Sequence, residues 1–244
     1  MGSGGDIAKI GLGIVTCDRA GYFKRAIESV NDHLIKKVDV ALVYNDGIKL
    51  LRPEPSEPWQ IKQGKPYQGV AHAKNWLLRT MLEQGCTHLF IMEDDMEVVS
   101  PQLLSIYIAA ARMNKMPHLN FSQHGPNTKI PLVAGNGVLE YWPNCCGAFS
   151  YYTRQIIEEH GFMDENFKGA YEHVEHTWRI YKKIFPYGVY PDVVGSTDYI
   201  REQKDALKNS TGPTDRKKRL AMINAARVYW QSKDKDCPLR GGTF

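Results

Sequence analysis

The stretch Gly85-Cys-Thr-His-Leu-Phe-Ile-Met-Glu-Asp-Asp-Met-Glu-Val98 decides the fold. Its apolar run, Leu89 to Met92, is rich in strand-forming residues and too short for a helix, so it predicts a buried strand. The run ends on Glu93, Asp94 and Asp95. Because side chains alternate along a strand, Glu93 and Asp95 should point one way and Asp94 the other. We therefore expect carboxylates at one sheet edge, where they suit Mg²⁺ or Mn²⁺; the alternative is a solvated acidic turn.

The length suits one large α/β core or two small domains, and we expect one domain. The chain has 244 residues, of which 43% are hydrophobic and 24% charged, an ordinary globular balance. A net charge of +4 suits a partner that carries phosphates but does not by itself predict nucleic-acid binding. The five cysteines lack metal-ligand spacing and indicate a reducing compartment, so we expect a cytoplasmic protein. We expect residues 1–9 to be a flexible leader and find no transmembrane segment in the sequence.

The segments before the acidic strand predict a βαβ unit. A strand over Ile10–Thr16 is followed by a helical stripe over Tyr22–Val30 and a second strand over Val38–Tyr44. The crossover between parallel strands should be right-handed, and ligands of such sheets lie beyond the carboxyl ends of the strands. Thr16 and Asp46 stand at those ends.

A helix with two cationic residues near its start comes next. Residues 51–66 carry four prolines and read as a surface excursion, and an apolar stripe over 69–82 then predicts a helix. His72 and Lys74 fall near its first turn, where the helix dipole disfavours cations. A bound phosphate would remove that cost. The alternative is a lysine that extends to solvent and a histidine that packs.

The second half of the chain predicts additions to the sheet and a C-terminal docking helix. Short strand-like pieces separated by Gly, Pro and Asn suit mixed or antiparallel pairing. They cover residues 118–122, 130–134, 137–142, 147–152 and 187–194, with helices over 101–113, 153–160, 171–184 and 214–233. We therefore expect one Rossmann-like domain over residues 10–194, with a central, mostly parallel mixed sheet flanked by helices. A loop and docking helix should follow over 195–244.

The order of these parts resembles a family-2-type nucleotide-sugar glycosyltransferase with the GT-A fold. Ile14–Arg19 is similar to the first-strand motif whose loop touches the nucleotide base, and Val43–Gly47 to the strand end whose Asp holds the uracil or its ribose. Ala71–Trp76 is similar to the Ala-Arg-Asn helix start near the diphosphate, and Glu93–Asp95 to the Asp-X-Asp metal motif. The residues thereby expected to bind the nucleotide sugar are Thr16, Asp18, Arg19, Asp46, His72, Lys74, Asn75 and Asp94. Those expected to bind the metal are Glu93, Asp95 and His176.

The resemblance extends to a helix that carries the expected base. Tyr171–Arg179 resembles the family's Glu-Asp-X-Asp-Leu-X-X-Arg segment, and Gly161–Phe167 before it resembles the Gly-Phe-Asp-Glu-X-Phe loop. In the family the Asp of Glu-Asp is the general base, and His173 stands at that position. The expected catalytic residues are Glu172, His173 and Glu175, with Glu172 favoured as the base and His176 nearest the metal. The alternative is a solvated helix face.

The resemblance implies transfer of a sugar from a nucleoside-diphosphate sugar, which we expect to be a UDP-sugar, to an acceptor hydroxyl. Mn²⁺ or Mg²⁺ and Lys74 would neutralise the leaving diphosphate, and inversion is the family's commoner outcome. The sequence leaves four classes of acceptor open: a saccharide, a protein, a small molecule and a modified nucleobase in DNA. A noncatalytic nucleotide-binding module of the same fold is the alternative. A nucleotidylyltransferase is disfavoured because no Gly-rich loop follows Ile14, and an Asp-X-Asp phosphohydrolase because the acidic residues follow the third strand.

Overall fold

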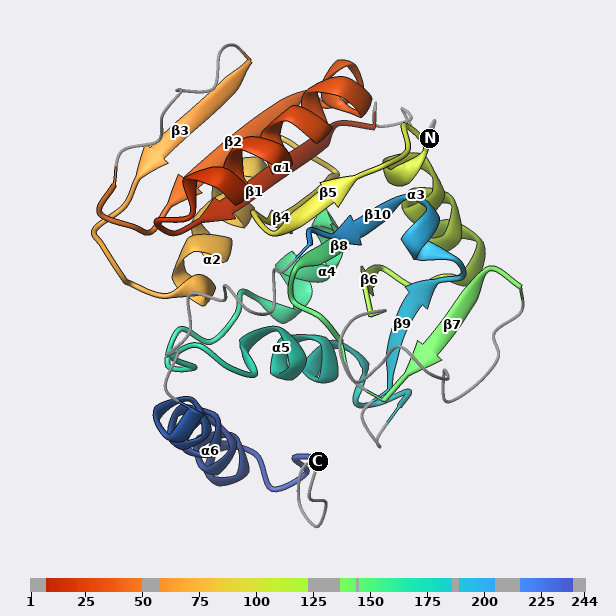
Figure 1. Cartoon of the computed structure of the whole chain (residues 1–244). Helices are drawn as coiled ribbons and strands as arrows, with labels where there is room; N and C mark the ends of the chain where they lie inside the picture. Colours follow the sequence, from red (N-terminus) through yellow and green to blue (C-terminus); the bar gives the residue numbers. More distant parts are fainter. Residues whose placement is uncertain are drawn as a thin grey trace.

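The computed structural model describes residues 8–49, 58–122, 137–143, 145–185, 189–204 and 216–238. A six-stranded sheet forms the centre of this part of the chain, in the order β3-β2-β1-β4-β8-β6 (Figure 1). Its strands are β1 (Ile10–Thr16), β2 (Val40–Asn45), β3 (Trp59–Gln63), β4 (His88–Glu93), β6 (His118–Asn120) and β8 (Phe149–Thr153). β1 to β4 run parallel, and β8 is antiparallel to both of its neighbours. The expected α/β class and mostly parallel mixed sheet are confirmed.

Helices cover both faces of this sheet because the side chains of its central strands alternate between two apolar layers. Phe90 and Met92 of β4 belong to the layer that holds α1 and α3, whereas Leu89 and Ile91 belong to the layer that holds α2, α4 and α5. The bounds of these helices are α1 (Ala20–His33), α2 (Val70–Glu83), α3 (Leu103–Asn114), α4 (Arg154–His160) and α5 (Glu172–Tyr181). A doubly covered sheet leaves its strand ends as the place for ligands.

Close packing of α2 on β1 fixes the position of the first helix turn. A Cβ on Gly13 of β1 would lie 2.9 Å from Leu77 Cδ1 of α2, so a side chain at this position would push the helix away. The glycine therefore brings the start of α2, with Lys74, against the carboxyl edge of the sheet.

One strand of the main sheet was missed in the sequence. β3 lies within the proline-rich segment that we read as a surface excursion, yet it pairs in parallel with β2. Only Trp59 of this strand is buried. An edge strand with one buried side chain leaves no alternating apolar pattern, which explains why the pattern did not reveal it.

Two smaller sheets correct other strand expectations. β7 (Leu139–Trp142) pairs with β9 (Tyr190–Val193) outside the main sheet, and β5 (Met96–Val98) pairs with β10 (Ile200–Glu202). β10 therefore lies in the segment after residue 194, where we expected only a loop and a docking helix. The strand expected over residues 130–134 lies outside the described residues. Single turns of 3₁₀ helix, η1 (Ile35–Lys37) and η3 (Ser196–Asp198), complete the connections.

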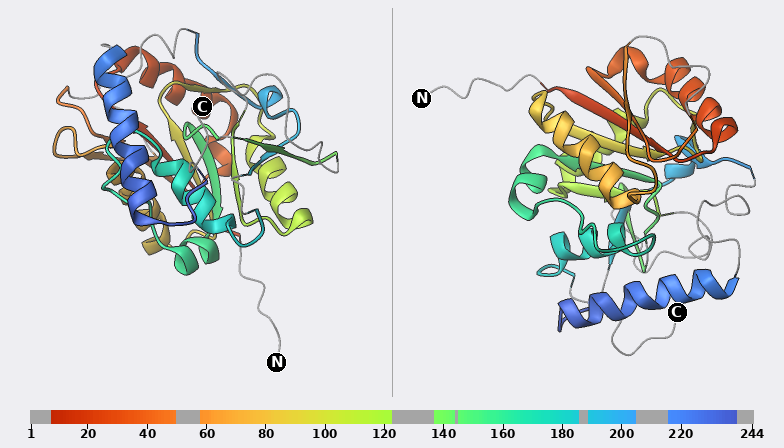
Figure 2. Two further views of the ribbon diagram at one scale, coloured as in Figure 1. Left: turned by 90° about the horizontal axis from the view of Figure 1, so that it is seen from below. Right: turned by 90° about the vertical axis from the view of Figure 1, so that its left-hand side faces the viewer.

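The C-terminal helix α6 (Arg216–Lys233) packs against α5, at the end of the molecule away from α1 (Figures 1 and 2). Trp230 of α6 is fully buried in an apolar cluster with Phe167 and Trp178.

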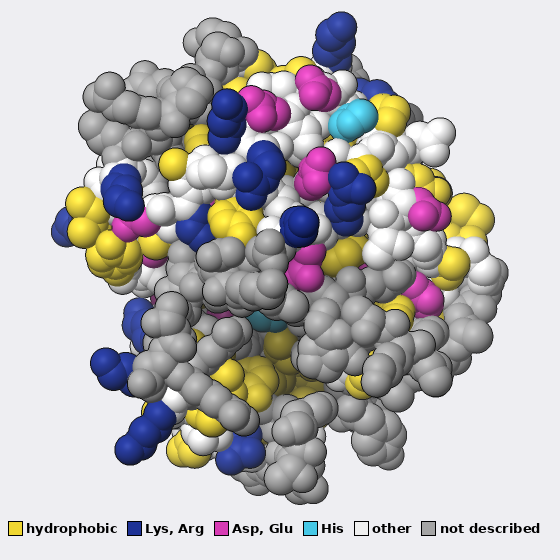
Figure 3. Space-filling view, viewed as in Figure 1, with side chains coloured by type: hydrophobic (Ala, Val, Ile, Leu, Met, Phe, Trp, Pro, Cys, Tyr) yellow, Lys and Arg dark blue, Asp and Glu magenta, His cyan; other side chains and the backbone are white. Residues whose placement is uncertain are grey.

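On the face drawn in Figure 3, acidic and basic side chains are interspersed over the sheet half, and basic side chains stand out over α6. None of the helices in the described ranges combines the length and apolar character needed to cross a membrane.

Candidate functional site

The ends of β1 and β4 meet at one sheet edge, and an arginine joins them. Thr16 Oγ1 donates to Asp94 Oδ2 at 2.6 Å. The Arg19 guanidinium donates to Asp94 Oδ1 and, at 3.0 Å, to Asp95 Oδ2. Burial raises the pKa of Asp94 to about 7, and the positive charge of Arg19 opposes that rise. Four residues expected at the nucleotide and metal sites are therefore brought together.

A buried lysine connects the acidic strand end to α5. Lys74 Nζ lies 2.6 Å from Glu93 Oε1 and 3.8 Å from Glu172 Oε1, and it donates to the Gly147 carbonyl at 2.7 Å. Its side chain is 1% exposed. Burial would lower the pKa of Lys74, but Glu93 and Glu172 raise it above its ordinary value, so the ammonium stays charged. The expected cation at the start of α2 thus faces carboxylates from two elements.

Glu172 and His173 form a pair beside this lysine. His173 Nδ1 lies 2.9 Å from Glu172 Oε1, and its Nε2 lies 3.2 Å from the Cys145 carbonyl oxygen. The His173 side chain is 19% exposed and that of Glu172 only 4%. Burial would raise the pKa of Glu172, but His173 and Lys74 together lower it to about 2. Glu172 is therefore a firmly ionised carboxylate, and the histidine is the more accessible member of the pair.

Glu175 and His176 do not join the acidic strand end. Glu175 accepts from Arg179 Nε at 3.1 Å and from Lys233 Nζ at 3.2 Å. His176 is fully buried, and its Nε2 donates to the Gly161 carbonyl at 2.9 Å. Burial, with Arg179 and His118, holds the pKa of His176 well below its ordinary range, so the ring is neutral. These contacts fix α5 to its surroundings, and within the described ranges only Nδ1 of the His176 ring lacks a partner. Glu175 as a base and His176 as a metal ligand stay predictions.

His72 and Asn75 hold the loop that precedes α5. Asn75 Nδ2 donates to the Met163 carbonyl at 2.9 Å, and Asn75 Oδ1 accepts from the Met163 N–H at 2.9 Å. His72 Nδ1 lies 2.8 Å from Glu165 Oε2. Both side chains therefore connect α2 to the 161–167 loop, a role that the sequence did not suggest.

Asp18 and Asp46 lie at the other end of the edge, beyond β1 and β2. The carboxylate of Asp46 accepts the N–H groups of Gln68 and Gly69, at 2.9 and 3.0 Å, and so fixes the entry to α2. Asp18 Oδ1 accepts from the Lys49 N–H at 2.8 Å. Each oxygen can accept a second bond, so these carboxylates can still receive a ligand donor.

Two residues of the site were missed in the sequence. Gly147, which we read as the start of a strand, allows the close approach of His173: a Cβ there would lie 2.6 Å from His173 Nδ1. Gln203 follows β10, and its Nε2 donates to the Asp94 carbonyl at 2.9 Å and the Met96 carbonyl at 3.1 Å. Neither a glycine nor a glutamine carries a sequence signal that would have marked these positions.

Comparisons with known proteins agree with this architecture. Neither a protein-family model nor a curated protein sequence matches the chain. The crystal structure of S. aureus TarS 1-349 aligns with a TM-score of 0.54 at 11% identity, over 93% of this chain and 73% of that chain. Mannosyltransferase PcManGT from Pyrobaculum calidifontis, in complex with GDP-Man and Mn²⁺, aligns with a TM-score of 0.53 at 11% identity, over 97% and 76%.

The crystal structure of GalNAc-T7 with UDP, GalNAc and Mn²⁺ gives a TM-score of 0.57 at 11% identity. The alignment covers 98% of this chain but 53% of that one, so this chain spans about half the length of the GalNAc-T7 chain. The protein has the GT-A fold. The fold expected from the sequence motifs is thereby confirmed.

The acidic turn of this GT-A fold leaves two buried polar atoms without partners. Asp95 Oδ1 and Arg19 Nε form no hydrogen bond within the described ranges. An acceptor without a partner fits a cation, and a donor without a partner fits an anion. Burial raises the pKa of Asp95, and the nearby charge of Glu93 adds to the rise. A cation between these two carboxylates would relieve their repulsion, although the part of the chain that the structure describes contains no group of three metal-binding side chains.

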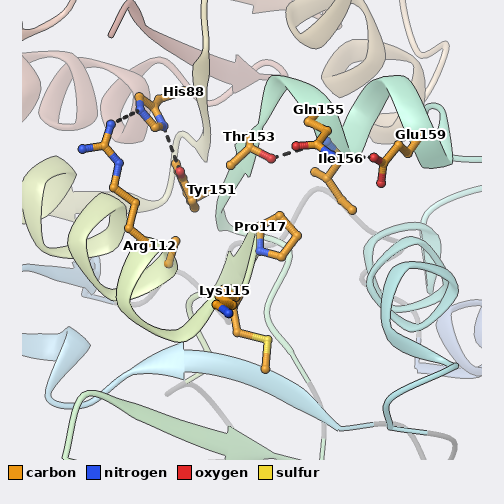
Figure 4. A pocket seen from close by; sticks show the side chains of 11 residues that line it. His88, Arg112, Lys115, Pro117, Tyr151, Thr153, Gln155, Ile156 and Glu159 are labelled. Atoms are coloured by element: carbon orange, nitrogen blue, oxygen red, sulfur yellow. Dashed lines mark hydrogen bonds between the residues drawn. The ribbon is translucent and has the colours of Figure 1, made fainter. Parts of the chain in front are cut away.

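A pocket of about 400 Å³ lies away from these residues, at the opposite edge of the GT-A sheet (Figure 4). His88 at the start of β4 and Arg112 and Lys115 at the end of α3 line it, with Tyr151 and Glu159. His88 Nδ1 lies 2.8 Å from Tyr151 Oη. Because none of the expected site residues lines this pocket, we place the candidate site at the carboxyl edge and not here.

Proposed function

We propose that the protein is a metal-dependent glycosyltransferase that moves a sugar from a nucleoside-diphosphate sugar, a UDP-sugar first of all, to an acceptor hydroxyl. The observation that carries the proposal is the pair of unpartnered atoms at the strand end, Arg19 Nε and Asp95 Oδ1, within the described residues. One donor and one acceptor, both buried, match a diphosphate and the cation that accompanies it. The GT-A neighbours with UDP or GDP-Man and Mn²⁺ support the same ligand class.

Glu93 and Asp95 would hold the metal, Mn²⁺ or Mg²⁺. When bound, the cation would neutralise charge that develops on the leaving diphosphate. Arg19 already contacts the carboxylates of Asp94 and Asp95, and Lys74 that of Glu93. Each cation would then interact with both its carboxylates and the phosphates. Asp46 would accept from the base or the ribose at the far end of the nucleotide.

His173 is the base that we propose, with Glu172 as its positioning residue. Glu172 holds Nδ1 of the ring at 2.9 Å, and its own basicity is reduced by His173 and Lys74. The more exposed imidazole would accept the acceptor's proton at Nε2 once that nitrogen leaves the Cys145 carbonyl oxygen, 3.2 Å away, and the carboxylate would stabilise the imidazolium that forms. This reverses the preference for Glu172 that we derived from the sequence. A single displacement assisted by such a base inverts the anomeric carbon.

Release of nucleoside diphosphate from a panel of UDP-sugars and GDP-mannose, with and without Mn²⁺, tests the proposed function. We expect Asp95→Ala to lose turnover and Mn²⁺-dependent nucleotide binding while keeping its fold, since Arg19 still pairs with Asp94 in this variant. Asp32→Ala, an exposed carboxylate on α1, is the matched control and should behave as the native protein. Full activity in EDTA, or in Asp95→Ala, would contradict the metal role.

Separate measurement of turnover and nucleotide affinity tests the base. His173→Ala should keep affinity and lose turnover, because a missing base affects only the chemical step. Glu172→Gln should lose less turnover than His173→Ala. The opposite order would return the base to Glu172.

A further inference from the structure

Two residues at the carboxyl edge of the sheet hold a backbone conformation that their side chains disfavour. Asp18 has a φ of 55° and Tyr67 a φ of 58°. The other non-glycine residues with positive φ in the described residues are Lys115 and Tyr171, which cap α3 and α5. Asp18 and Tyr67 cap no helix. A left-handed conformation is uncommon for a bulky residue such as tyrosine and persists only where the surroundings enforce it.

Hydrogen bonds enforce the conformation of Tyr67 at both ends of the residue. Its N–H donates to the Asp46 carbonyl oxygen at 2.7 Å, and its Oη donates to Asp18 Oδ2 at 2.7 Å. Asp18 in turn is held by the Lys49 N–H. The loop after β1 and the loop before α2 are thereby joined through the tyrosine.

Tyr67 is nevertheless 60% exposed as a whole residue. Its ring therefore adds little apolar contact to the fold, although the backbone is strained to present it. An exposed aromatic ring that is already rigid in the free protein loses little further conformational entropy when a ligand binds. Such a ring favours stacking of a planar ligand on its face.

The surroundings indicate which part of a ligand would lie there. The Asp18 carboxylate contacts the Tyr67 hydroxyl, and the Asp46 carboxylate holds the N–H groups of the two residues after Tyr67, so a phosphate at this place would be repelled. The cations Arg19 and Lys74 are instead directed to the β4 end of the same edge, where they contact Asp95 and Glu93. An uncharged planar group fits the tyrosine, and the phosphates of the same molecule fit the cations.

Resting on the proposed function, we propose that Tyr67 is the stacking platform for the nucleobase of the donor nucleotide. Asp18 is its positioning residue, which sets the ring through the bond to Oη. The nucleotide then extends along the edge from Tyr67 to the acidic turn at the end of β4.

Calorimetry with UDP and with inorganic pyrophosphate, each in Mn²⁺, tests the assignment in the full chain. Tyr67→Gly should weaken UDP binding by roughly 5- to 150-fold, the range that base stacking supplies, and leave pyrophosphate affinity unchanged. Its thermal midpoint should not fall, because glycine adopts positive φ freely. Tyr67→Phe, which keeps the ring but loses the bond to Asp18, should weaken UDP binding less. Asp18→Ala should resemble Tyr67→Phe. Asp18→Asn should weaken UDP binding less, because its Oδ1 can accept from the Lys49 N–H while its Nδ2 donates to the Tyr67 hydroxyl oxygen.

Lys115→Gly is the matched control, since it relieves the same backbone strain at the C-cap of α3 and should leave both affinities unchanged. Native UDP affinity in Tyr67→Gly, or an equal loss for UDP and pyrophosphate, would overturn the stacking role and leave the proposed function standing. If the native protein binds none of UDP, GDP, CDP and ADP, the proposed function fails and this inference fails with it.

Discussion

At the scale of single residues, Gly147 controls how closely His173 and Lys74 approach each other. Its carbonyl accepts from Lys74, and a Cβ would lie 2.6 Å from His173 Nδ1 and 3.0 Å from Lys74 Nζ. We expect Gly147→Ala to displace the imidazole, which is held at both nitrogens, and to lower turnover by about 100-fold. Stability should fall by only about 1–3 kcal/mol. Measurement of nucleoside diphosphate release and of urea unfolding checks both effects.

Gly21→Ala provides the comparison for that variant. Gly21 lies in α1, and the nearest side-chain atom to a Cβ there is 4.0 Å away. Alanine should therefore stabilise the helix by about 0.5–1 kcal/mol and leave turnover unchanged. Unchanged turnover in Gly147→Ala as well would show that the position of His173 does not matter to the reaction.

Glu172 makes the stability of the protein depend on pH in acid. Its pKa is lowered from 4.5 to about 2 in the folded state, so the folded protein binds fewer protons there than the unfolded chain. The resulting stabilisation, about 3 kcal/mol, is fully present above pH 4.5 and is lost as the pH falls through 2. We expect the native protein to lose about half of this stabilisation between pH 7 and pH 3. Glu172→Gln has no carboxyl group at this position, so it should not show this loss. Urea unfolding at the two pH values measures the difference, and equal losses in both proteins would contradict it.

The sequence indicated where charged residues stand along the chain, but not which residues they contact in the folded protein. Glu93, Asp94 and Asp95 could be placed at the strand end because an apolar run that stops on carboxylates marks where a buried strand ends, although it does not exclude a solvated acidic turn. Glu175 and His176 lie away from the acidic strand end, which the sequence could not show because four polar residues within one helical turn do not reveal which of them faces the sheet edge. Tyr67 could not be found, since its strained backbone and its contact with Asp18 exist only once the two loops meet.

At the scale of elements, β10 supports the acidic turn from outside the segment that the family motifs cover. Gln203 Nε2 donates to the carbonyl groups of Tyr22, Asp94 and Met96, and its N–H donates to the Asp95 carbonyl at 2.7 Å. Gln203→Ala would leave buried carbonyl oxygens without donors, at about 1–3 kcal/mol. We expect lower stability and weaker Mn²⁺-dependent nucleotide binding, measured by thermal unfolding and calorimetry.

Arg201 on the same strand supplies the control for Gln203. Its side chain is 59% exposed and pairs with Glu97 at 3.1 Å, so Arg201→Ala should change stability by no more than about 0.5 kcal/mol. If Gln203→Ala binds the nucleotide as tightly as Arg201→Ala, β10 is not a support of the site.

Elements with a repeating apolar pattern were predictable, and short edge elements were not. The helix expected over residues 153–160 is present, with Thr153 Oγ1 accepting the Ile156 N–H at 3.3 Å and Gly161 at its C-cap. β5 and β10 have three residues each, too few for a period to be recognised. Their pairing is set by tertiary contact across about a hundred residues of sequence, which local patterns do not contain.

At the scale of the whole molecule, α6 connects the C-terminal segment to the helix that carries Glu172 and His173. Lys233 Nζ lies 2.7 Å from Asp164 Oδ2 and 3.2 Å from Glu175 Oε1, so α6 contacts both the 161–167 loop and α5. The boundary expected at residue 194 stays a prediction. The contacts of α6 make this boundary testable. If α6 folds on its own, loss of a buried side chain in it should leave the domain stable, whereas if α6 folds with the domain, the same loss should destabilise both.

Trp230→Ala decides between these two arrangements. The indole is fully buried against Phe167, Tyr171 and Trp178, so its removal should cost about 3–5 kcal/mol. If α6 unfolds together with the sheet, a single calorimetric transition should shift downward by about 6–12 °C, and turnover should fall because α5 loses its support. Val228→Ala, on the same helix with 60% of its side chain exposed, should leave the midpoint within about 1 °C. An unchanged main transition with a separate early one in Trp230→Ala would instead show that α6 folds apart from the domain, and full turnover would then place the reaction entirely within the residues that precede it.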